Sequence, residues 1–245
     1  MNQLAKVPKQ HPTSSADWDR LAADCQRMAD TEWELRSILI HLHPDQRMNV
    51  VRPTACRKQL DALPADVVAE AEALLARLEE ALAPATKADV AKWVGLLVGA
   101  FPTANTPDPK VYVQLMIAEV LSDAPGRAVL EIALRKVWRS KTFLPAIAEV
   151  LSQVRQTQKE WVNWHERTAA VPDLYARTSE RIRDAEQRVA EYVRKLLLGG
   201  KGNQQLWMYD PDIVERVKAE LGPDRIEQAR RQRDARTVWT DGESF

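Results

Sequence analysis

Residues 64–84 read PADVVAEAEALLARLEEALAP, and their pattern predicts a helix. Apolar side chains recur at steps of three and four, the spacing that places them on one face of a helix. Pro64 suits the first helical turn, and Pro84 cannot continue the helix. The stretch therefore predicts an amphipathic helix whose apolar face other helices must cover.

The same spacing continues on both sides of this stretch and predicts further helices. They are expected to run from about Ser15 to His41, from Lys87 to Phe101, from Pro109 to Leu121, from Val129 to Trp138, from Pro145 to Ala170, from Leu174 to Leu197, from Pro211 to Leu221 and from Asp224 to Arg236. Gly95 and Gly99 suggest close helix packing. The expected fold is all-α, an irregular helical bundle with a long helix and a mobile C-terminal helical arm.

Prolines and glycines suggest how this bundle is divided. We expect an arm at 1–13, a helical pair at 14–84, a module with a long helix at 85–170, and an amphipathic helix at 172–198. The run Gly199-Gly200-Lys201-Gly202 predicts a linker, followed by charged helices within 199–245. The bundle is expected to span 15–170, with 172–245 as a mobile helical arm.

Composition narrows the class of protein. Apolar residues make up 45% of the chain, enough for a core, yet no stretch of apolar residues is long enough to cross a membrane. The first residues lack the apolar segment of a secretion signal. Cys25 and Cys56 form no metal-binding or redox motif, which favours two reduced thiols. We therefore expect a cytoplasmic protein that does not enter a membrane.

Catalytic patterns are missing from the sequence. The run around Lys201 has no adjacent Ser or Thr and follows a helix, unlike a phosphate-binding loop. His41 and His43 lack further metal ligands, and His165 and Glu166 are neighbours that do not face each other on a helix. No nucleophile motif occurs. We expect no catalytic residues, no metal and no cofactor.

Tryptophans and arginines supply the candidate binding residues. Trp18, Trp33, Trp93 and Trp138 fall on apolar faces and are expected in the core, whereas a second set in polar surroundings could anchor a partner. This second set is Trp161, Trp164, Trp207 and Trp239. Packing against a neighbouring helix is the alternative for that set. Candidate nucleic-acid contacts are Arg225, Arg230, Arg231, Arg233 and Arg236, for which a solvated helix face is the alternative.

A short motif follows the basic stretch Arg135 to Lys141 and reads Phe143-Leu144-Pro145-Ala146-Ile147-Ala148-Glu149. Pro145 fits the first position of a helix, while Phe143, Leu144 and Ile147 could fill the corner between two helices. With the Phe101-Pro102 stop and the Tyr112 helix upstream, the region Ala88 to Val154 resembles the core module of phage replicative-helicase loaders and inhibitors. In that family the signature, which here includes Glu149, marks the end of a small helical bundle.

The resemblance implies a phage or prophage replication accessory protein that binds the host replicative helicase, loads or inhibits it, and has no ATPase of its own. It also implies delivery to an origin complex, so that DNA or an origin-binding protein is a further candidate partner. The alternative is a nucleic-acid-binding accessory protein that uses the C-terminal arginines, and a third interpretation is an enzyme whose site the sequence does not reveal. A homo-oligomer is also an open option.

Overall fold

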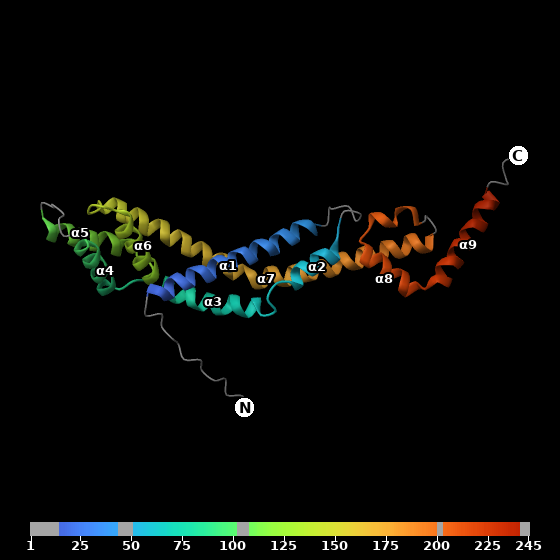
Figure 1. The fold of residues 1–245 in the computed structure, drawn as a ribbon, viewed down its shortest axis with the longest axis horizontal. Helices are drawn as coiled ribbons and strands as arrows, with labels where there is room; N and C mark the ends of the chain where they lie inside the picture. Colours follow the sequence, from blue (N-terminus) through green and yellow to red (C-terminus); the bar gives the residue numbers. More distant parts are fainter. Residues whose placement is uncertain (1–14, 44–50, 102–107, 200–202, 241–245) are drawn as a thin grey trace, which may run out of the picture. The chain divides into compact units, whose positions relative to one another are not determined.

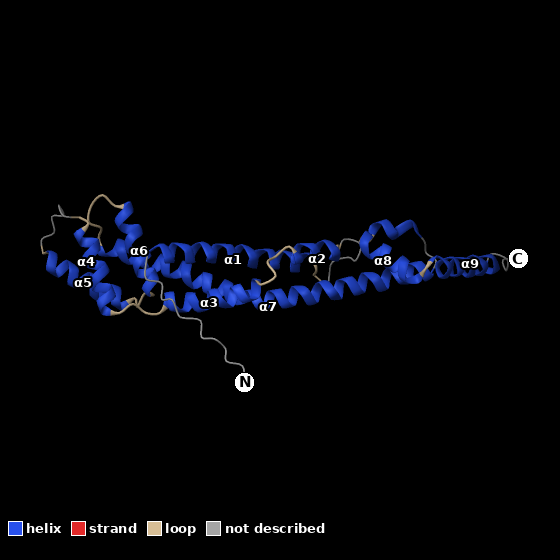
Figure 2. Cartoon of the chain, turned by 60° about the horizontal axis from the view of Figure 1, so that its bottom comes forward, coloured by secondary structure: helices blue, strands red, loops and turns tan. Residues whose placement is uncertain are grey.

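A computed structural model describes residues 15–43, 51–101, 108–199 and 203–240 (Figure 1). These residues form α-helices and one short 3-10 helix, η1, and they contain no β-strand, which confirms the all-α prediction (Figure 2). The elements are α1 (Ser15–His41), α2 (Pro53–Asp61), α3 (Val67–Leu82), α4 (Lys87–Gly99), α5 (Pro109–Ser122), α6 (Arg127–Ser140), α7 (Ile147–Gly199), η1 (Asn203–Met208), α8 (Pro211–Leu221) and α9 (Pro223–Thr240). The arm predicted at 1–13 lies outside the described residues.

The chain divides into two compact units. Unit 1 comprises Met1–Asp30 and Ala69–Ala170, and unit 2 comprises Thr31–Val68 and Val171–Phe245. The two long helices α1 and α7 are therefore each divided, with one part in unit 1 and the other in unit 2. Within α7 the boundary between the units falls between Ala170 and Val171, next to the expected division at Pro172. The expected helical pair at 14–84 does not form one unit, because its residues are divided between unit 1 and unit 2.

Unit 1 has a core built from α4, α5, α6 and the start of α7. Its buried side chains are Val90, Val94, Leu97, Met116, Val120, Leu130, Ala133, Leu134, Val137, Val150, Leu151 and Val154. A capping box begins α4, in which Thr86 and Asp89 exchange hydrogen bonds. The Asp108 carboxylate caps α5 by accepting from the backbone N–H groups of Lys110 and Val111. Local sequence thus fixes where these helices begin.

Polar contacts join the first half of α1 to the rest of unit 1. The buried Trp18 indole Nε1 donates to Glu131 of α6 at 3.2 Å. Asp24 accepts from Arg77 of α3 at 2.9 Å, and Arg167 of α7 donates to the Ala29 carbonyl at 2.7 Å. These contacts connect residues that are far apart in sequence, so they fix the packing of unit 1 rather than its helices.

Two connections of unit 1 pair with each other at Gly126. Ala85 N–H donates to the Pro125 carbonyl, and Arg127 N–H donates to the Ala83 carbonyl, both at 2.9 Å. Gly126 N–H donates to the Gln158 side chain on α7 at 3.0 Å. A Cβ atom at Gly126 would lie 2.9 Å from the Ala81 carbonyl oxygen, closer than van der Waals contact allows. Glycine is therefore required here for close backbone approach.

Unit 2 has its own apolar core between the second half of α7 and the η1–α8 segment. Its buried side chains are Val189, Val193, Leu196, Leu197, Leu206, Tyr209, Ile213, Val214 and Val217. Partly buried Ile226 of α9 packs against this cluster, and the described residues of α9 beyond it are mostly exposed. The core thus holds the beginning of α9 and leaves the remainder to solvent.

Asp210 joins two helix starts of unit 2. Its buried carboxylate caps α8 through the Asp212 N–H and also accepts from the Thr54 N–H of α2 at 3.0 Å. The Thr54 hydroxyl donates to the same carboxylate at 2.8 Å. The residue at the N-cap of α2, Arg52, gives that helix no side-chain cap. A carboxylate 156 residues away therefore supplies the capping contact that α2 lacks locally.

Three predictions about helices differ from the structure. The sequence predicted a break at Pro172, yet α7 continues through it, held by the buried side chains of Val171 and Leu174 on either side. The short helix α2 was missed, since it is short and receives its cap from Asp210. Gly95 and Gly99 do not mark close packing, because a Cβ atom at either would meet no atom within 4 Å.

Candidate partner-binding surfaces

The signature motif forms a clamp at the start of α7. The Glu149 carboxylate accepts from the backbone N–H of Ala146 at 2.9 Å and from the Lys141 ammonium at 2.5 Å. Together these two contacts lower the pKa of Glu149, with the Lys141 bond as the larger cause. One carboxylate therefore caps α7 and ties it to the end of α6.

A second contact fixes the same corner from α5. The Tyr112 hydroxyl donates to the Pro145 carbonyl at 2.5 Å, and Pro145 itself is buried. Burial raises the pKa of Tyr112 to about 12, and the nearby Glu149 carboxylate adds to that rise. The hydroxyl therefore stays protonated throughout the physiological pH range and donates a hydrogen bond to the Pro145 carbonyl.

Parts of the predicted role of the signature are wrong. Pro145 does not occupy the first position of a helix, because α7 begins two residues later, at Ile147. Ile147 packs against the core of unit 1 and Leu144 is half-buried, but Phe143 is 81% exposed and does not fill the corner. The corner is closed by Pro145 and the Tyr112 hydrogen bond instead.

The tryptophans also divide differently from the prediction. Trp18 is buried and Trp93 packs against the core of unit 1, as expected, whereas Trp33 and Trp138 are 66% and 46% exposed. Trp161, a predicted anchor, is 1% exposed, and the half-buried Trp164 lies against its ring. The Trp239 side chain lies outside the described part. The error on α1 has a clear cause, since buried Glu32 takes the core position beside Trp33 and pairs with Arg36.

Trp207 is exposed, one of the two outcomes that the sequence left open, and it is held in a fixed segment. Its side chain is 79% exposed, while Leu206 before it and Tyr209 after it are buried in the core of unit 2. The Arg52 guanidinium also donates to the Met208 carbonyl at 3.2 Å. A large aromatic side chain on an anchored backbone loses little freedom on binding, as an interface anchor requires.

The candidate arginines lie on α9. Arg225, Arg230 and Arg231 are exposed, and Arg231 pairs with Glu227 at 3.3 Å. The side chains of Arg233 and Arg236 lie outside the described part. The described cations of α9 thus project from a solvated helix, which leaves them accessible to a polyanion.

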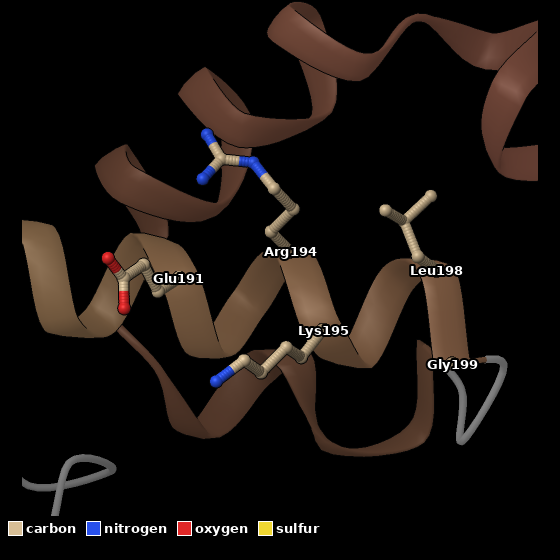
Figure 3. A pocket seen from close by; sticks show the side chains of 5 residues that line it. All are labelled: Glu191, Arg194, Lys195, Leu198 and Gly199. Atoms are coloured by element: carbon tan, nitrogen blue, oxygen red, sulfur yellow. The ribbon is translucent and has the colours of Figure 1, made fainter.

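A shallow hollow lies at the end of α7. It is lined by Glu191, Arg194, Lys195, Leu198 and Gly199, and Figure 3 shows Arg194 and Lys195 extending from different sides of the helix. Arg194 pairs with Glu220 of α8 at 2.7 Å, so its charge is balanced within the protein.

The buried cysteines are poor nucleophiles. Burial is the largest cause of the raised pKa of both thiols, and it brings that of Cys25 to about 12. Among the described residues no group of His, Cys, Asp and Glu is placed to hold a metal ion.

Comparisons of the chain with models of protein families, with curated proteins and with solved structures yield no match. No helix within the described ranges has both the length and the apolar character needed to cross a lipid bilayer.

Proposed function

We propose that this protein is an accessory factor of phage or prophage DNA replication that binds the host replicative helicase and loads or inhibits it, without an ATPase of its own. The identity of the partner rests on the resemblance of Ala88 to Val154 to the loader and inhibitor family. The observation that carries the binding role is Trp207, an exposed aromatic side chain held between buried neighbours.

Several features support a binding role for unit 2. The Trp207 side chain belongs to the segment 172–245, the arm that the resemblance to the loader and inhibitor family suggests as the part that grips the partner. Its backbone is fixed by the core and by the Arg52 hydrogen bond, so binding would order few groups. Exposed tryptophans on such supports are the side chains that most often dominate interface energies.

Mixing the protein with a bacterial replicative helicase tests this function. We expect light scattering to report a complex at micromolar concentrations, and Trp207→Ser to weaken it about thirtyfold, the effect of about 2 kcal/mol at an interface anchor. Trp33→Ser is the matched control, because Trp33 is also an exposed tryptophan of unit 2. It should leave the affinity unchanged.

The two ways in which this experiment can fail are distinct. If the unaltered protein forms no complex with the helicase, the proposed function is wrong. If a complex forms and Trp207→Ser binds as tightly as the unaltered protein, the helicase is the partner and the assignment of Trp207 is wrong.

A second candidate function, direct contact with DNA, is favoured by the exposed arginines of α9. In that case binding to duplex DNA should weaken steeply with salt, and Arg230→Ala with Arg231→Ala should lower the slope of log affinity against log salt by about two. The matched control is Arg183→Ala with Arg188→Ala on α7, which are also exposed. This role is contradicted if the DNA affinity does not change with salt concentration, or if both double substitutions lower the affinity equally.

A further inference from the structure

A second exposed aromatic surface lies on unit 1 at the end of α6. We call it the aromatic corner and define it by Trp138, Arg139 and Phe143. Trp138 is 46% exposed and Phe143 is 81% exposed. Phe143 also lies between two fixed points, since Lys141 bonds to Glu149 and Pro145 bonds to Tyr112. The backbone that presents this phenylalanine is therefore held in place, although its ring remains in solvent.

Apolar surface continues on the helix that contacts this corner. Val111 and Leu115 of α5 are 48% and 51% exposed and lie one helical turn apart. Tyr112, which stands between them in sequence, makes the hydrogen bond to Pro145. Helix α5 thus presents a further exposed apolar pair, so that unit 1 offers several exposed apolar side chains rather than one isolated ring.

Most of the basic side chains in this region are paired within the protein. Residues 132–148 include Arg135, Lys136, Arg139 and Lys141 but no acidic residue. Lys136 and Lys141 pair with Glu160 and Glu149 of α7, and buried Arg135 lies near Asp19 and Glu131. Among the described residues, Arg139 is exposed and has no acidic partner. The corner therefore combines aromatic side chains with a cation that is available to an incoming carboxylate.

We propose that the aromatic corner binds an amphipathic helix of a partner protein whose apolar stripe is flanked by acidic residues. A helix presents apolar side chains at three- and four-residue spacing, which suits anchors such as Trp138 and Phe143. Its acidic flank complements Arg139, which has no acidic partner among the described residues. Nucleic acid fits less well, because the two lysines already hold carboxylates and few cations remain for phosphates.

A labelled peptide and the full-length protein test this proposal. The probe is a fluorescein-labelled helical peptide of about five turns, with leucines on one face and glutamates on both flanks, followed by fluorescence anisotropy. We expect micromolar binding that weakens as salt is added. Trp138→Ser with Phe143→Ser should weaken it more than about tenfold, and Arg139→Glu should weaken it and reduce its salt dependence.

Matched controls separate this surface from other sources of binding. Trp33→Ser with Ile40→Ser removes an equally exposed apolar pair from unit 2 and should leave the peptide affinity unchanged, as should Trp207→Ser. Because Trp138 is only half-exposed, helical content is compared for all variants, and Arg139→Glu tests the corner without altering an apolar side chain. A peptide with lysines in place of glutamates should bind more weakly.

The proposal is overturned if the acidic peptide does not bind, if the lysine peptide binds as tightly, or if the corner variants keep full affinity. Binding of a single-stranded oligonucleotide that is lost in Arg139→Glu, without peptide binding, would assign the corner to nucleic acid instead. None of these results bears on the helicase, whose proposed contact, Trp207, lies in unit 2. The two proposals therefore stand or fall separately.

Discussion

Replacing Asp210 with alanine is expected to destabilise unit 2 by about 3 kcal/mol, the sum of a lost helix cap and lost charge-assisted hydrogen bonds. The substitution leaves the N–H groups of Thr54 and Asp212 without this acceptor, at the starts of α2 and α8 together. Because Asp210 is fully buried, water has little access to replace the carboxylate. Amide hydrogen exchange in α2 and α8 should accelerate together.

Asp212→Ala is the matched control for this prediction. Asp212 lies two residues away and also carries a negative charge, but its carboxylate is exposed and pairs only with the exposed Lys58. Pairs of this kind contribute little, so the control should cost less than about 1 kcal/mol. Equal effects of the two substitutions would show that Asp210 acts through net charge rather than by capping two helices.

Gly126→Ala is expected to destabilise unit 1 by about 2 kcal/mol through overpacking. The added Cβ atom would lie 2.9 Å from the Ala81 carbonyl oxygen and from Leu82 Cα, and both are backbone atoms that cannot rotate away. The backbone pairing at Ala83, Ala85, Pro125 and Arg127 would have to open in response. Chemical denaturation followed by circular dichroism measures the loss, and hydrogen exchange should locate it at the start of α6.

Gly95→Ala provides a control with the opposite sign. Gly95 is exposed inside α4, and a Cβ atom there would meet nothing within 4 Å. Alanine should therefore stabilise unit 1 by about 0.8 kcal/mol, because it favours the helix more than glycine does. The two substitutions should therefore change stability in opposite directions. A loss of stability in Gly95→Ala as well would contradict the explanation from helix propensity and backbone contact.

The position of each helix was largely predictable because the signals are local. The three- and four-residue spacing, the Thr86 and Asp108 caps and the Pro211 start all lie within the helix they define or next to it. Helix α2 was missed for the converse reason, since its capping contact comes from Asp210 at the other end of the sequence. Local rules also failed at Pro172, where burial of neighbouring side chains keeps α7 continuous.

The candidate surfaces were less predictable than the helices. Sequence spacing assigned Trp138 to the core, yet its side chain is 46% exposed. Trp161, for which the sequence left open a partner anchor or packing against a neighbouring helix, is buried. A helix has several faces that carry apolar residues, and the spacing alone does not say which of them another helix will cover. For Trp207 the sequence left open an exposed anchor or packing against a neighbouring helix, and its side chain is 79% exposed.

The amino-acid sequence by itself determined that this protein is all-α, where most of its helices begin, and that Phe143 to Glu149 marks a corner. Helical periodicity and capping depend on residues within a few positions of one another, so one chain suffices to detect them. Only the tertiary structure decided which aromatic side chains meet solvent and how Asp210 and Gly126 connect distant segments. Those outcomes depend on contacts between residues far apart in sequence, which local patterns do not record.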